Sequence, residues 1–250
     1  MENKTLRIVS WNCKCGFDEK KPEIINKLNA DILVIPECRE MDKDSMDKFG
    51  FDNIWYGDHE EAKYKSGEIN KIKDLGIGVF WKNGITVNEM TEWKELKNNS
   101  NFRYLVPYKV EGNFETFTLI VVWTKAKGIT GEKDILEYTQ KAHAAIDYYG
   151  KKDLLKNKVI FIGDFNTGSI KGASNASRYE DLVRAFIKKD FKNCADGQEW
   201  VPTFFKGSNS WLDDHCFASN DIEVISFGIG NSDFWRKYSD HSPIIIDFII

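Results

Sequence analysis

The sequence predicts an α/β fold in which strands and helices are stacked in layers. Short runs rich in β-branched and aromatic residues recur along the whole 250-residue chain. Segments with helical periodicity lie between these runs, and several of the runs end in polar residues. Strands with polar ends that alternate with amphipathic helices are typical of a layered α/β sandwich.

Nine segments are predicted to be strands because they are bounded by turn residues and rich in Val, Ile, Phe, Tyr and Trp. They are residues 6–11, 31–37, 77–81, 104–110, 117–123, 158–165, 212–219, 222–229 and 243–250. This frequency indicates large sheets. No linker rich in Pro, Gly or Ser and no low-complexity tract divides the chain, so we expect one domain over residues 1–250.

Three segments have the periodicity of amphipathic helices: residues 21–30, 132–157 and 177–189. In the first, Pro22 suits a helix start. The apolar faces predicted for the three are, in order, Ile24, Ile25 and Leu28; Ile135, Tyr138, Ala142, Ile146 and Tyr149; and Leu182, Val183, Phe186 and Ile187. These faces are expected to cover the sheets.

Composition limits the possible functions without selecting one. A net charge of −4 gives no overall attraction to nucleic acid, so such binding would depend on local basic groups. The five cysteines lack CxxC spacing and are expected to be reduced and structural. The N-terminus has no secretory signal and no apolar run reaches membrane-spanning length, so a cytoplasmic location is expected.

Polar side chains that suit metal and phosphate chemistry gather at the predicted strand ends. These residues are Asn12, Glu37, Asp164, Asn166, Asp213, Asp214, Asp240 and His241. Each also has a structural interpretation as a turn former or cap. Because strand ends line a crevice in α/β sheets, the set together predicts a site for a hard divalent cation such as Mg²⁺, with a histidine that titrates near neutrality. Those are the parts of metal-assisted phosphoester hydrolysis.

The order of five motifs carries a family resemblance. IVSWN, ILVIPE, IGDFN, WLDDHCFAS and SDHSPI follow one another along residues 6 to 246. In this order they resemble the endonuclease/exonuclease/phosphatase superfamily, which includes DNase I-like and exonuclease III-like nucleases. The resemblance implies a four-layer α/β sandwich, with two mixed β-sheets packed face to face and flanked by helices.

The resemblance also implies roles for individual residues. Glu37 matches the main metal-binding glutamate, with Asn12 beside it and Asp240 as a second acidic position near the metal. Asp164 matches the aspartate that positions or activates the attacking water. Asn166 matches the asparagine that contacts the scissile phosphate.

The remaining motif residues form the part of the site that carries a proton. His241 matches the histidine that contacts and polarises the phosphate, and Asp214 matches the aspartate that orients it. Because side chains alternate along a strand, Asp213 is expected to point the other way. His215, where relatives usually carry Tyr, is expected to be a packing or surface residue.

Two segments depart from the family pattern. Lys14 occupies a position where some relatives have an acidic metal-site residue, which leaves open whether one metal or two are bound. Trp123 or Thr124 stands where relatives have His or Tyr, so the acid for the leaving group is not identified, and Lys125 is a candidate substitute.

We therefore predict a Mg²⁺-dependent phosphodiesterase, with Mn²⁺ as a possible substitute, whose substrate is nucleic acid and in the first place DNA. Arg103, Lys125 and Trp123 are candidate substrate contacts. One alternative is a phosphatase or phosphodiesterase acting on a small molecule or lipid headgroup. Another is a degenerate, non-catalytic module that binds nucleic acid or phosphate. We expect a monomer without a membrane partner.

Overall fold

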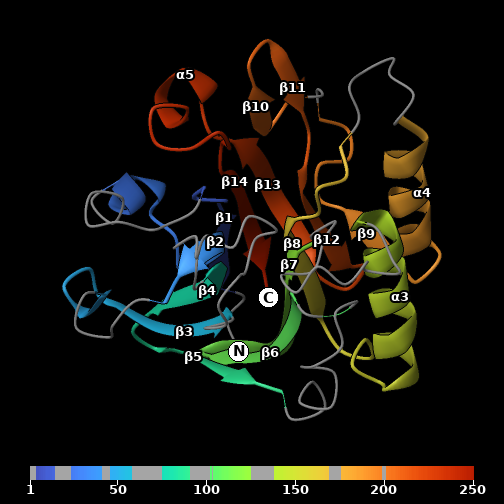
Figure 1. Cartoon of the computed structure of the whole chain (residues 1–250). Helices are drawn as coiled ribbons and strands as arrows, with labels where there is room; N and C mark the ends of the chain where they lie inside the picture. The colour runs from blue at the N-terminus through green and yellow to red at the C-terminus, as the bar shows by residue number, and fades with distance from the viewer. Residues whose placement is uncertain are drawn as a thin grey trace, which may run out of the picture.

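The computed structural model describes residues 4–14, 24–40, 46–57, 75–90, 102, 104–124, 138–168, 176–198 and 201–250. Within these residues the chain forms two six-stranded sheets and a separate two-stranded hairpin (Figure 1).

The first sheet has the strand order β13-β14-β1-β2-β4-β3. Its strands are β1 (Thr5–Ser10), β2 (Ile32–Arg39), β3 (Phe51–Gly57), β4 (Leu75–Lys82), β13 (Glu223–Ile229) and β14 (Ile244–Ile249). β1 pairs in parallel with β2, whereas the other neighbours pair antiparallel. The sheet is therefore mixed.

The second sheet has the order β5-β6-β7-β8-β12-β9. Its strands are β5 (Ile85–Glu89), β6 (Leu105–Gly112), β7 (Phe114–Trp123), β8 (Val159–Asp164), β9 (Phe191–Asn193) and β12 (Asp214–Ser219). It is also mixed, because β7 and β8 are parallel and the other pairs antiparallel. The separate hairpin consists of β10 (Phe204–Lys206) and β11 (Asn209–Trp211).

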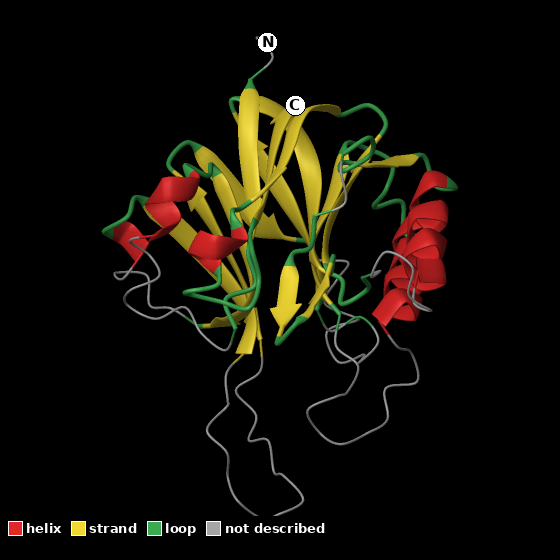
Figure 2. Ribbon diagram, turned by 90° about the horizontal axis from the view of Figure 1, so that it is seen from above, coloured by secondary structure: helices red, strands yellow, loops and turns green. Residues whose placement is uncertain are grey.

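Helices lie outside both sheets, as the view from above shows (Figure 2). α3 (Tyr138–Lys151) and α4 (Ala176–Ile187) cover the second sheet. The 3₁₀ helix η1 (Asn26–Leu28) and α5 (Ser232–Trp235) lie on the side of the first sheet. The predicted α/β sandwich of two mixed sheets flanked by helices is confirmed.

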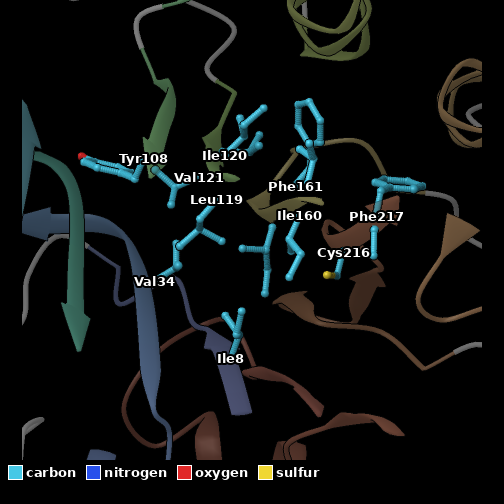
Figure 3. Packing of buried hydrophobic residues seen from close by; sticks show 14 of the residues in the cluster. Ile8, Val34, Tyr108, Leu119, Ile120, Val121, Ile160, Phe161, Cys216 and Phe217 are labelled. Atoms are coloured by element: carbon cyan, nitrogen blue, oxygen red, sulfur yellow. The ribbon is translucent and has the colours of Figure 1, made fainter. Parts of the chain in front are cut away.

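The core fills the space between the two sheets and the space under the helices. Ile8 of the first sheet faces Leu119 and Ile160 of the second, and all three are fully buried (Figure 3). Under α4, the ring of Phe186 stacks on Phe217, with centroids 3.8 Å apart. Successive side chains of β7, β8 and β12 point to opposite faces of the sheet, so these strands supply apolar side chains both to the space between the sheets and to the space under the helices.

All nine predicted strands are present. β3, β5, β9, β10 and β11 were not predicted, because they are short or carry polar residues at alternate positions. No helix of the described residues is long and apolar enough to cross a bilayer. The four described cysteines, Cys13, Cys38, Cys194 and Cys216, are buried, as expected of structural thiols.

The helix predictions are partly confirmed. Residues 24–28 form only a short helical turn, although its apolar side chains are buried as predicted. α3 buries Ala142, Ile146 and Tyr149, whereas Ile135 lies outside the described residues. The prediction for Ile187 is wrong, because this side chain is 57% exposed. It is the last residue of α4 and lies about 100° round the helix from the buried residue before it.

Candidate active site

Five strand ends meet at one edge of the sandwich. The end of β1 pairs with the start of β14 through Ser10 and Ile244, and β1 runs parallel to β2. In the second sheet, Asp164 at the end of β8 pairs with Asp214 at the start of β12. The polar residues that follow or precede these strands are therefore brought to one place.

Gly163 allows β8 to deliver Asp164 to this edge. Its φ is +148°, and a Cβ at this position would lie 2.0 Å from the carbonyl oxygen of Val122 in the parallel neighbour β7. A side chain here would separate the two strands. The glycine in the IGDFN motif thus has a packing role immediately before the first acidic residue.

Asp164 is buried and both of its carboxylate oxygens are held. Oδ1 accepts a hydrogen bond from the backbone N–H of Asn166 at 2.8 Å, and Oδ2 accepts one from Nδ2 of Asn12 at 2.9 Å. Burial and the negative charge of Asp214 raise the pKa of Asp164 well above its usual range. The result is an oriented carboxyl with a stronger affinity for a proton than an exposed aspartate has.

Asn166 forms the turn that follows β8. Its backbone is left-handed, with φ 45°, a conformation that asparagine tolerates better than most residues. Its side-chain Nδ2 donates to the carbonyl oxygen of Thr124 at 2.8 Å. That bond uses one of the two amide hydrogens, so the fixed amide still offers a second donor to a ligand.

Asp214 and His241 form a buried carboxylate–imidazole pair. Nδ1 of His241 lies 2.8 Å from Oδ2 of Asp214. Burial opposes a charge on the imidazole, but the charge and hydrogen bond of Asp214, with Asp164 and Asp240 nearby, raise the pKa of His241 to about 10. The ring is therefore protonated at neutral pH, and Nε2–H is the donor left for a ligand.

Two supporting residues were not found by sequence reasoning. Oγ1 of Thr203 accepts the backbone N–H groups of Asp213 and Asp214 at 3.0 and 3.1 Å, which fixes the start of β12. Ser239 donates to the carbonyl oxygen of Asn12 at 2.7 Å, and its Oγ accepts the backbone N–H of His241 at 3.1 Å. Ser239 directly precedes Asp240 and His241 in the SDH motif, so the sequence could have identified it as a supporting residue. Nothing in the sequence distinguishes Thr203.

Glu37 reaches the same edge from β2. The register of β2 with β4 shifts between Pro36 and Cys38, and Glu37 at this β-bulge has a left-handed backbone with φ 55°. Backbone N–H of Cys13 donates to the carbonyl oxygen of Pro36 at 3.3 Å, so the segment after β1 runs beside Glu37. A bulge with a non-glycine residue at positive φ often aims a side chain at a functional site.

Asp240 is paired with a lysine. Nζ of Lys14 lies 2.9 Å from Oδ2 of Asp240, and the backbone N–H of Lys14 donates to Oδ1 of Asn12 at 2.9 Å. The ammonium group competes with any cation at this carboxylate. The structure therefore brings Asp240 to the edge of the site but pairs it with the positive charge of Lys14.

The donors that could hold a metal are hard oxygen atoms, which suit Mg²⁺. Among the described residues, no group of three or more His, Cys, Asp or Glu is placed to hold an ion by protein ligands alone. Mg²⁺ commonly takes only one or two carboxylates and completes its shell with water and substrate phosphate. Glu37 with the amide oxygen of Asn12 fits that second kind of site.

The candidate substrate contacts are not assembled in the described structure. Trp123 is buried at the end of β7, with its ring centroid 4.8 Å from that of Tyr104, so it packs in the core. Thr124 is buried and its hydroxyl donates to the carbonyl oxygen of Phe165. Arg103 and Lys125 lie outside the described residues.

His215 packs inside the second sheet. Its Nε2 lies 2.8 Å from the carbonyl oxygen of Thr167, and its ring stacks on Tyr179 with centroids 5.1 Å apart. Burial lowers the pKa of His215 to about 4, in spite of this hydrogen bond. This is the packing role expected for it.

We expect His215 to make the protein less stable in mild acid. The unfolded chain binds a proton at this residue below pH of about 6.5, but the folded chain binds it only below about 4, so stability falls between these values. At pH 5 the loss is about 2 kcal/mol relative to pH 7. Urea unfolding at both pH values should show a smaller loss in His215→Phe, and an equal loss would contradict this assignment.

Comparison with known proteins shows the family of this chain. A family model described as the Endonuclease/Exonuclease/phosphatase family matches residues 9–241. The chain belongs to this family. A comparison with curated protein sequences gave no significant match.

Solved structures of this family have the same fold. A Bacteroides thetaiotaomicron family protein is 15% identical, with a TM-score of 0.63 over 100% of this chain and 99% of its own. The 3′ phosphatase NExo from Neisseria, bound to a product DNA hairpin, is 13% identical, with a TM-score of 0.66 over 98% and 100%. An AP endonuclease from Archaeoglobus fulgidus is 13% identical, with a TM-score of 0.64 over 98% and 100%.

Proposed function

We propose that this protein is a Mg²⁺-dependent phosphodiesterase that hydrolyses nucleic acid, in the first place DNA. One observation carries the proposal: two buried hydrogen-bonded pairs lie side by side. Asp164 pairs with Asn12 and Asp214 pairs with His241, and Asp164 and Asp214 are directly opposite each other on β8 and β12. One pair provides a base and the other an acid. Hydrolysis of a phosphodiester needs both: a group that accepts a proton from water and a group that stabilises charge on phosphate.

Asp164 is the group that handles the water. Its raised pKa, caused by burial and by Asp214, makes it a stronger proton acceptor than an exposed aspartate. The hydrogen bonds from Asn12 and Asn166 hold the carboxylate in one orientation. A water molecule held by this carboxylate would attack phosphorus in line with the leaving oxygen.

His241 is the group that meets the phosphate. Asp214 keeps the ring charged and anchors Nδ1, so Nε2–H can donate to a phosphate oxygen as negative charge develops there. The remaining amide hydrogen of Asn166 supplies a neutral donor from the turn after β8. These donors are fixed before the substrate arrives, which lowers the cost of reorganisation during the reaction.

Glu37 would hold the metal ion, with Asn12 beside it. A bound Mg²⁺ supplies positive charge to the phosphate oxygens. Lys14 provides a second positive charge at Asp240, so we propose that this chain needs one metal ion rather than two. The protein would then offer one carboxylate, that of Glu37, and the amide oxygen of Asn12 to the metal, and chelation should remove activity reversibly.

The test is cleavage of phosphodiester substrates with Mg²⁺, Mn²⁺ or chelator. Plasmid DNA, single strands, an abasic-site duplex, RNA and bis(p-nitrophenyl) phosphate would be compared for the wild type, His241→Ala and Glu37→Gln. We expect metal-dependent cleavage that falls by at least about 10²-fold in both variants. In Glu37→Gln we expect more metal to be needed for half-maximal activity, because an amide is a weaker ligand than a carboxylate.

Matched control variants are His143→Ala in α3 and Glu111→Gln in β6, which change the same residue types in elements that carry none of the proposed catalytic or metal-binding residues. Both should retain wild-type activity. The outcomes separate the alternatives: hydrolysis of the small ester alone favours a small-molecule phosphodiesterase. Binding of nucleic acid without any cleavage, unaffected by His241→Ala, would identify a non-catalytic module and overturn the proposal.

A further inference from the structure

A cavity of about 240 Å³ opens directly beside Asn166. Its walls include Asn166, Arg178, Phe204, Trp211 and Asp213. They come from the turn after β8, from α4, from the β10–β11 hairpin and from the start of β12. Cavities for drug-sized ligands are usually larger than about 300 Å³, so this one suits a single small planar group.

One wall of the cavity is aromatic. Phe204 and Trp211 are opposite each other in the β10–β11 pair, and their rings stack with centroids 5.4 Å apart. The Phe204 ring also lies 4.7 Å from the imidazole of His241. Both rings are half-buried, which leaves part of their surface at the cavity. The aromatic wall therefore joins the cavity to the residue proposed to bind phosphate.

Asp213 places a carboxyl group at this cavity. Its backbone is fixed, because its N–H donates to Thr203 and its carbonyl oxygen accepts the N–H of Phe165 at 2.9 Å. Among the residues that the structure describes, none donates a hydrogen bond to the side chain. Burial and the charge of Asp214 raise the pKa of Asp213 to about 7.

Gly168 makes room for this carboxyl group. A Cβ at position 168 would lie 2.3 Å from Oδ1 of Asp213, so any larger residue would displace the side chain. Alternation along β12 turns Asp213 away from His241, as expected, but it places the carboxyl beside Asn166 rather than outside the site. A half-buried carboxylate that lines a cavity can exchange its hydrogen bonds to water for hydrogen bonds from a ligand.

We propose that this cavity binds the nucleobase next to the scissile phosphate, and that Asp213 selects bases that carry an exocyclic amino group. The inference rests on the proposed action on nucleic acid. Stacking on the Phe204–Trp211 wall accepts any base, because every base has a π-face. The carboxylate adds selection: it accepts a hydrogen bond from the amino group of adenine, cytosine or guanine, and it repels the carbonyl oxygens of thymine or uracil.

Arg178 completes the site on its outer side. Its side chain is exposed at the rim of the cavity, where a guanidinium can pair with the phosphate of the bound nucleotide. The cavity thus offers one feature for each part of a nucleotide: an aromatic wall and a carboxylate for the base, and an arginine and Asn166 for phosphate.

The test measures binding without catalysis. The affinities of AMP, CMP, GMP and UMP would be measured by calorimetry at pH 8 with chelator present, since Asp213 is then mainly ionised. We expect the wild type to bind the three amino-bearing nucleotides about tenfold or more tightly than UMP. In Asp213→Asn, whose amide both donates and accepts, the ratio should fall toward one. Asp196→Asn, an exposed residue, is the matched control and should keep the wild-type ratio.

The outcomes separate this inference from the proposed function. Equal affinity for the four nucleotides, no detectable binding, or a ratio that survives in Asp213→Asn overturns the base selection. Selective binding by a protein that cleaves no nucleic acid supports the inference and contradicts the proposed hydrolysis. Oligonucleotides that differ only in the bases flanking a single cleaved bond should show the same order in kcat/KM, and the order should disappear in Asp213→Asn.

Discussion

Replacing Asp214 with asparagine is expected to lower kcat by about 10²- to 10⁴-fold, which is the range that a positioned proton donor contributes. Asparagine keeps the size of the side chain but removes the charge that faces Nδ1 of His241 at 2.8 Å. The imidazole would then be neutral at working pH, and its Nε2 would no longer be held as a donor. Substrate affinity should change less than kcat.

The pH profile of kcat gives the sharper readout. In the wild type the required form of His241 is protonated, so activity is present below its pKa and is lost as pH rises through about 10. In Asp214→Asn this alkaline limb should move down toward the ordinary histidine pKa of about 6.5. Asp153→Asn, a surface aspartate paired with Lys156 at 3.0 Å, is the control and should keep the wild-type profile. An alkaline limb that stays near 10 in Asp214→Asn would show that Asp214 does not set the charge of His241.

The fold was predictable because its signals are local. Apolar runs such as VIFIG and FTLIVV have the length and residue types of buried strands, and helical periodicity marks the segments that cover them. The edge strand β3 was missed because Asp52 and Asn53 break its apolar pattern, and the β10–β11 hairpin because its strands have only three residues each. Their positions depend on tertiary contacts that no local pattern carries.

The candidate site was predictable in its parts but not in its connections. The motifs identified Asp164, Asn166 and His241, and the fold places all three at one edge. The pairing of Lys14 with Asp240 joins residues far apart in the chain, and Thr203 supports residues ten and eleven positions after it across a turn. Such contacts follow from the packing of the two sheets, so the sequence alone gives no distance between them.

Repulsion between the buried carboxyl groups of the site is offset by neighbouring groups. The carboxyl groups of Asp164 and Asp214 lie on directly paired positions of neighbouring strands, and the second raises the pKa of the first. The charged ring of His241 and the amide of Asn12 offset this repulsion. The site therefore keeps one carboxyl able to take a proton and one imidazole able to donate a hydrogen bond, within the same buried cluster.

Replacing Gly163 with alanine is expected to lower the free energy of unfolding by about 3 to 5 kcal/mol, among the largest effects of a single substitution. Two causes add: the backbone φ of +148° is unfavourable for alanine, and the new Cβ would lie 2.0 Å from the carbonyl oxygen of Val122. β7 and β8 would have to separate at the point where their hydrogen bonds end. Urea unfolding of the purified variant measures the loss.

Gly84→Ala separates the two causes, because Gly84 also has a positive φ, +88°, but a Cβ there would meet nothing within 4 Å. It should cost about 1 to 2 kcal/mol from backbone strain alone. If both variants lose the same stability, the contact with Val122 does not matter and the strands are not held together there. The other outcome is that Gly163→Ala loses more stability than Gly84→Ala and that its folded protein also has a lower kcat. That result would show that the close approach of β8 to β7 positions Asp164. Gly84→Ala should leave kcat unchanged, since its turn lies between β4 and β5 and not at the edge that carries the site.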